Sequence, residues 1–183
     1  MNREEALEIL FEYTKSDALR KHAFAVESCM LAYAEKFGEN LEEWSVTSIL
    51  HDFDYEIYPN APDHPMKGSG ILEEKSVNEK IRRAILGHAS YTNVPRDSLL
   101  AKTLFACDEL AGFITAVALV RPNKTVDEVE VKSVLKKMKD KAFARNVNRE
   151  DIILGAQGIG VELNEHIQFC IDAMKKNKDL LGL

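Results

Sequence analysis

Hydrophobic residues along this chain recur at the three- and four-residue spacing of α-helices, and no segment shows the strict alternation of a strand. The longest such pattern lies between Ser16 or Asp17, which can cap the start of a helix, and Gly38, which can end it. The apolar face of this helix is formed by Leu19, Ala23, Val26, Met30, Ala34 and Phe37. The pattern predicts an all-α fold.

Capping residues and prolines set the bounds of the other predicted helices. Asn40 and Asn78 can cap two of them, Pro65 suits the first position of a third, and Thr125 begins a capping box. Helices are expected at about residues 2–13, 17–37, 41–52, 66–75, 79–88, 98–120, 126–138, 149–156 and 161–178. No linker or internal repeat is visible, so a single-domain helical bundle is expected over residues 1–183, with helices at 123–183 packed on a core at 17–120.

The composition is that of a globular protein, with 45% hydrophobic and 30% charged residues. The net charge of −6 argues against binding to nucleic acid polymers or anionic membranes. No apolar run approaches the roughly 20 residues that cross a bilayer. The acidic start does not resemble a targeting peptide and the three cysteines lie within predicted helices, so a cytoplasmic location is expected. The oligomeric state is left open.

Four of the five histidines occur with aspartates in the order H…HD…H…H…D. Five predicted helices each carry one part of this pattern, which consists of His22, His51 with Asp52, His64, His88 and Asp108. One such histidine alone is more typical of a hydrogen-bonded structural residue. Several imidazoles and carboxylates on apolar helices are together typical of a metal site, because a cation then neutralises them.

Nitrogen and oxygen ligands suit Fe, Mn or Co, and such a site can also acquire Zn or Ni during purification. Six ligands exceed the three or four that one catalytic metal takes from a protein, since a position must stay open for water. Two divalent transition metals are therefore expected, with Asp52 bridging them. The sequence does not identify the native metal.

The order of these residues resembles the HD-domain superfamily of metal-dependent phosphohydrolases, whose defining motif is H…HD…D. The resemblance covers about half of the chain, from His22 to Leu110. The stretch from His64 to Gly68 and the Gly87-His88-Ala89 segment before Asp108 resemble the binuclear branches. The HD-type diadenosine tetraphosphate hydrolases are the most similar branch.

This resemblance implies an HD-type helical bundle with two metals. His22, His51, Asp52 and Asp108 would hold one ion, and His64 and His88 would complete the second site through Asp52. The implied reaction is hydrolysis of a phosphate ester or anhydride in a nucleotide or another small phosphorylated molecule, with a metal-bound hydroxide as the nucleophile.

The chain departs from the family in two places. Phe53-Asp54-Tyr55 follows the HD pair where some branches have a lysine. The Gly-Tyr-Pro signature of cyclic-di-GMP phosphodiesterases is absent after His88, which argues against that substrate.

A basic side chain is expected to bind the substrate phosphate. Lys67, one turn after His64, is the candidate for a catalytic role beside Asp52, and Lys67, Arg20 and Arg145 are the candidates for substrate binding. Each is otherwise a solvated surface cation. Asp54 and Glu56 can protonate a leaving group or simply be exposed.

Two other functions remain open at this point. Some HD-fold proteins use the same six ligands around a di-iron centre as oxygenases. A non-catalytic protein that binds a metal or a nucleotide is the second alternative. Tightly held iron with substrate-dependent O₂ uptake would favour the first, and nucleotide binding without turnover would favour the second.

Overall fold

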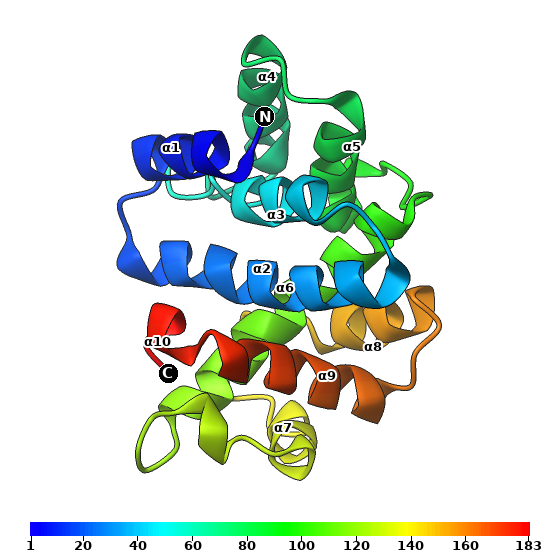
Figure 1. The fold of residues 1–183 in the computed structure, drawn as a ribbon. Helices are drawn as coiled ribbons and strands as arrows, with labels where there is room; N and C mark the ends of the chain where they lie inside the picture. Colours follow the sequence, from blue (N-terminus) through cyan, green and yellow to red (C-terminus); the bar gives the residue numbers. More distant parts are fainter.

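The computed structural model describes all residues 1–183 and is all-helical, as predicted. Ten α-helices and two 3₁₀ segments follow one another without any strand (Figure 1). The α-helices are α1 Arg3–Tyr13, α2 Asp17–Phe37, α3 Leu41–Leu50, α4 Asp63–Glu74, α5 Glu79–His88, α6 Leu99–Leu119, α7 Val131–Met138, α8 Arg149–Gly158, α9 Leu163–Lys176 and α10 Lys178–Leu181. The 3₁₀ segments are η1 Ser90–Thr92 and η2 Val126–Glu128.

Most helix ends lie where the capping residues predicted them. The Ser16 side chain caps the start of α2, and Gly38 ends that helix in the left-handed conformation with a φ of 70°. Asn40 and Asn78 cap α3 and α5 in the same way as Ser16. These bounds follow from local hydrogen bonds, which is why the sequence alone could place them.

The bounds predicted for two helices, at residues 126–138 and 161–178, differ from those in the structure. Thr125 forms no capping box and caps only η2, through the Asp127 amide, and α7 starts at Val131 behind a capping box at Glu130. Val126 and Val129 are both buried in the core, with Val129 in an extended conformation, so tertiary packing overrides the local helix signal here. The last predicted helix also ends early, because Asn177 leaves the helical conformation and separates α9 from α10.

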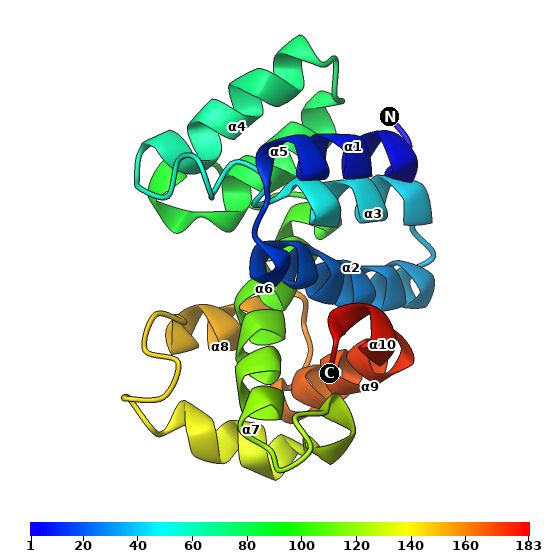
Figure 2. The same ribbon diagram turned by 90° about the vertical axis from the view of Figure 1, so that its left-hand side faces the viewer.

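Two hydrophobic clusters meet along α2. The larger has 27 buried residues, many of them from α2, α6 and α9, and the smaller has 12 buried residues from α1 to α5 and the turns between them. Figure 2 shows α1, α3, α4 and α5 on one side of α2, and α7 to α10 on the other. Phe24 of α2 packs against both clusters. A side chain on the inner part of α2 is therefore placed between the two halves of the molecule.

An ion pair between a buried carboxylate and a partly exposed arginine ties α1 to α2. Glu27 is only 4% exposed and accepts hydrogen bonds from Arg3 Nε at 2.7 Å and Nη2 at 3.0 Å. The Ser45 hydroxyl of α3 donates to the same carboxylate. Because the Arg3 side chain is 44% exposed, the free-energy cost of removing the pair from water comes mainly from Glu27.

The variant Arg3→Met is expected to lower the free energy of unfolding by about 2 kcal/mol at neutral pH, because it leaves the Glu27 carboxylate buried without its cation. The loss is below that of a fully buried pair, since water can replace part of an exposed guanidinium. Urea unfolding measures it, with Lys75→Met as the control, because the Lys75–Glu12 pair is more exposed and contributes less than about 1 kcal/mol. Equal losses in the two variants would contradict the role given to Arg3.

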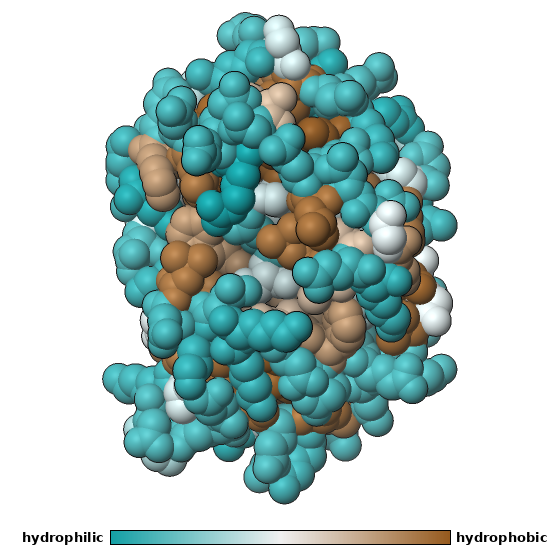
Figure 3. Space-filling view, in the orientation of Figure 1, coloured by the Kyte–Doolittle hydropathy of each residue, from teal (hydrophilic) through white to brown (hydrophobic).

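The outer surface is mostly hydrophilic. On the face seen in Figure 3, the most prominent hydrophobic patches lie around its middle, and smaller ones appear toward the top and the bottom. None of the helices combines the length and the apolar character that a membrane crossing requires.

Candidate metal centre

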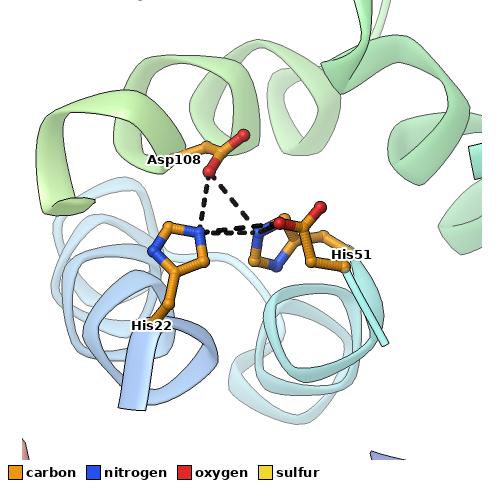
Figure 4. Close-up of side chains that lie close together, drawn as sticks. His22, His51 and Asp108 are labelled. Atoms are coloured by element: carbon orange, nitrogen blue, oxygen red, sulfur yellow. Dashed lines mark hydrogen bonds and ion pairs between the residues drawn. The ribbon is translucent and has the colours of Figure 1, made fainter. Parts of the chain in front are cut away.

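The structure brings the six predicted ligand residues together from five helices or helix ends. They form two groups whose candidate ligand atoms lie within 4.8 Å of one another in each group. The first consists of His22, His51, Asp52 and Asp108, and the second of Asp52, His64 and His88. Figure 4 shows His22, His51 and Asp108 converging from α2, from the end of α3 and from α6. These groups could hold metal ions, and Asp52 belongs to both.

In the first group, three side chains make close contacts through the atoms that would bind a metal. His22 Nε2 lies 3.0 Å from Asp108 Oδ1 and 3.2 Å from His51 Nε2. His51 Nε2 lies 3.5 Å from Asp108 Oδ1. Asp52 joins this group through Oδ2, which is 3.6 Å from His51 Nε2.

In the second group, two imidazoles face each other beside the other oxygen of Asp52. His64 Nε2 lies 3.3 Å from His88 Nε2, and each of these nitrogens lies 3.3 Å from Asp52 Oδ1. The two carboxylate oxygens of Asp52 are thus divided between the groups. This is the arrangement that a bridging carboxylate requires.

The far nitrogens of three of the histidines are held by acceptors. His51 Nδ1 donates to the Ser48 carbonyl at 2.7 Å, and His88 Nδ1 donates to the Ile85 carbonyl, three residues back at the end of α5. A carbonyl oxygen can only accept, so each Nδ1 carries the hydrogen and each Nε2 presents a lone pair to the cluster. Acceptors at the far nitrogen are usual for histidines that bind a metal.

With Nδ1 of His64 held by Asp54, as described below, these tautomers make the paired Nε2 atoms of His64 and His88 a site for a cation. In the His64–His88 pair, two imidazole lone pairs 3.3 Å apart repel each other unless a proton or a metal ion lies between them. The structure has no lysine or arginine among the residues of the adjoining cavity that could supply the charge. The donor set of imidazoles and carboxylates therefore fits divalent transition metals.

His64 is held differently, by the carboxylate of Asp54. Asp54 is fully buried, and its Oδ1 lies 2.8 Å from His64 Nδ1. Its Oδ2 accepts the Gly68 amide at 3.0 Å. Both oxygens are engaged and out of reach of solvent, so Asp54 orients His64 and is neither the exposed residue nor the proton donor that the sequence left open. Glu56 is exposed and accepts the amides of Lys15 and Ser16 before α2.

The charges of the cluster shift several pKa values in the direction that attracts cations. Burial opposes ionisation of Asp52, but the charge of His51 and hydrogen bonds from the second histidine pair outweigh it and hold the Asp52 pKa well below its usual range. Burial likewise lowers the His64 pKa, but Asp52 and Asp54 together raise it to about 9. Without a metal, the cluster therefore holds protons near neutral pH.

These pKa values predict opposite pH dependences for metal affinity and for the stability of the metal-free protein. His64 must lose its proton to bind a metal, so metal affinity is expected to rise up to about pH 9. Because the His64 pKa is raised in the folded state, protonated His64 stabilises the metal-free fold fully below about pH 6.5. This contribution to the free energy of unfolding is lost as the pH rises to about 9. Calorimetric metal titrations in buffers of different ionisation enthalpy, beside thermal unfolding of the metal-free protein, measure both. A metal affinity independent of pH would contradict the assignment of His64.

A cavity of about 630 Å³ opens beside the two groups. Five of the six ligand residues line it, the exception being His51, which is fully buried behind them. The other walls come from the turn after α3, from the α5–η1 segment, from α6 and from the start of α8. Their side chains include Tyr55, Tyr91, Phe105, Glu109, Asn148 and Asp151. A small molecule in this cavity would contact the candidate metal site directly.

The three basic residues singled out from the sequence do not line the cavity. Lys67 is exposed on the outside of α4, and Arg145 is exposed in the turns between α7 and α8. Arg20 donates to the Thr14 carbonyl at 2.8 Å and lies over the Phe11 ring. Their proposed contacts with a substrate phosphate remain untested predictions that the geometry does not support.

Sequence analysis missed other residues of the cavity. Tyr91 donates from its hydroxyl to the His64 carbonyl, and Asn148 and Asp151 reach the site because α8 packs on α6. No spacing in the sequence could have indicated Asn148 or Asp151, since they lie outside the H…HD…H…H…D pattern.

No protein-family model, curated protein or solved structure matches this chain significantly. The similarity to the HD-domain superfamily therefore depends on the order of the histidines and aspartates in the sequence.

Proposed function

We propose that this protein is a binuclear, metal-dependent phosphohydrolase of the HD type that acts on a small phosphate ester. The observation that carries the proposal is the division of the two Asp52 oxygens between two groups of imidazoles. Fe, Mn or Co are the proposed metals, since the donors are nitrogen and oxygen. Metals of this kind, when bound as a pair, activate water and stabilise the charge of an in-line phosphoryl displacement.

The residues of the chain have separate parts in this proposal. The first group and the second group would hold one metal each, and Asp52 would fix their separation. Asp54 and the Ser48 and Ile85 carbonyls orient three of the imidazoles, so that their Nε2 atoms already face the cluster. A phosphate bound in the cavity would lie next to Asp52, His64 and His88, which line its wall.

The test is phosphate release by protein that has been stripped of metal and reloaded separately with Mn²⁺, Fe²⁺ or Co²⁺. The substrates are p-nitrophenyl phosphate, simple alkyl phosphates, nucleoside monophosphates and dinucleoside polyphosphates. Release that needs the added metal is the expected result. Absence of release from every substrate, with two equivalents of metal bound, would overturn the proposal. Substrate-dependent O₂ uptake in the iron form would replace it with the di-iron oxygenase.

A further inference from the structure

The cavity beside the candidate metal centre is lined by acids but by no lysine or arginine. Besides the ligands Asp52 and Asp108, it contains Glu109 of α6 and Asp151 of α8. Asn148 donates to Asp151 at 2.8 Å, which positions that carboxylate at the start of α8. A phosphohydrolase that binds a polyanion normally presents arginine or lysine to it. An acidic wall is better suited to a positively charged part of a substrate.

The nearby basic side chains are already engaged elsewhere. Arg96 lies over the Phe105 ring at 3.7 Å and donates to the Gly87 carbonyl, behind the cavity wall. Arg149 donates to the carbonyls of Ala144 and Val147. Neither residue lines the cavity, and both would have to give up these hydrogen bonds to reach a bound phosphate.

Charge counting leads to the same conclusion about the substrate. When all of them are ionised, Asp52, Asp108, Glu109 and Asp151 supply at most four negative charges, which the two divalent metals of the proposed function would balance. A phosphate monoester then adds about two negative charges, and every further phosphate group would add more. A positive charge on the substrate reduces this excess. Glu109 and Asp151 are the carboxylates of the lining that are not candidate metal ligands, and the charge of Arg96 also acts on Asp151.

Aromatic side chains complete the environment of such a cation. Tyr55 and Tyr91 line the cavity, and Tyr91 is fixed by its hydrogen bond to the His64 carbonyl. Aromatic faces attract ammonium groups through their quadrupole. Carboxylates and aromatic rings together can bind an ammonium group, the first through charge and the second through the ring face.

We infer that the substrate is a phosphate monoester whose alcohol part carries an ammonium group, with the phosphate at the metals and the ammonium at Glu109 and Asp151. This inference rests on the proposed function, since it assigns the substrate class of the same site. In the reaction, water adds to phosphorus and the bond from phosphorus to the ester oxygen breaks. The products are inorganic phosphate and the amino alcohol, and a proton goes to the leaving oxygen.

The experiment compares aminoethyl phosphate and its longer homologues with hydroxyl-terminated phosphates of the same length, using the metal-reloaded protein. A charged hydrogen bond between the ammonium group and the protein favours the amino phosphate. At the chain length with the largest difference, we expect its kcat/KM to be about 10- to 100-fold higher than that of the hydroxyl-terminated phosphate. Asp151→Asn and Glu109→Gln are expected to bring this ratio toward one. Glu150→Gln is the matched control, because Glu150 is exposed on the same helix and does not line the cavity. Calorimetry with aminopropylphosphonate and propylphosphonate, which are not hydrolysed at a P–O ester bond, measures the same preference as binding.

The outcomes separate this inference from the proposed function. Phosphate release without any preference for the ammonium member, or a preference unchanged in both carboxylate variants, would overturn the inference alone. A binding preference that the variants abolish, with no phosphate release in any metal form, would support the ammonium site and overturn the phosphohydrolase.

Discussion

Replacing Asp52 by alanine is expected to remove both metals and all measurable metal-dependent phosphate release. Each carboxylate oxygen of Asp52 lies beside a different group of imidazoles, so a single substitution deprives both groups of an anionic donor. Loss of even an indirect partner of a metal ligand costs about 10- to 100-fold in affinity. The loss of a shared ligand is therefore expected to exceed about 100-fold.

Metal content after dialysis and calorimetric affinity measure this loss, and circular dichroism checks the fold. Asp52 lies in the turn after α3, so most of the helicity is expected to remain. Asp97→Ala is the control, because Asp97 pairs with Arg83 at the surface, away from the cluster. Unchanged metal content in the Asp52→Ala protein would contradict the assignment of the whole centre.

Gly68→Ala is expected to weaken metal binding by about 10- to 100-fold although Gly68 does not contact the ligand atoms. A Cβ atom at Gly68 would lie 2.6 Å from Asp54 Cγ and Oδ2, closer than any real contact. Asp54 is fully buried and cannot turn into solvent, so it must shift away from the Gly68 amide and from His64 Nδ1. His64 then loses the acceptor that orients its Nε2 toward the cluster.

Gly70→Ala is the matched control on the same helix, because a Cβ atom there has no neighbour within 4 Å. In a helix interior, alanine is favoured over glycine, so Gly70→Ala is expected to raise the free energy of unfolding by about 0.5–1 kcal/mol with unchanged metal affinity. Metal titrations and urea unfolding of the two variants test both statements. Equal metal affinities in the two proteins would show that the position of Asp54 does not depend on Gly68.

The helices and the order of the candidate ligands could be predicted from the sequence because both depend on local patterns. The caps at Ser16, Asn40 and Asn78 act within one turn of their own helices. Periodicity then placed the histidines and aspartates on separate helices. Where the prediction of helices failed, at Thr125, the burial of Val126 and Val129 outweighed the local signal.

The cavity could not be predicted in this way, because its walls come from segments far apart in the chain. His22 and Asp108 are separated by 86 residues and yet lie 3.0 Å apart. Sequence spacing does not show which side chains face a common space, and the basic residues it favoured, Lys67 and Arg145, lie outside the cavity. The order of residues suggested that the cluster exists, but packing decided what surrounds it.

The sequence by itself thus determined the helices and the set of candidate metal ligands, since capping and periodicity act over a few residues. Tertiary structure alone decided that Asp54 holds His64, that Gly68 leaves room for it, and that Asp151 faces the cavity. The physical reason is burial. A carboxylate on a polar segment becomes a fixed hydrogen-bond acceptor only when the packing of distant helices removes it from water.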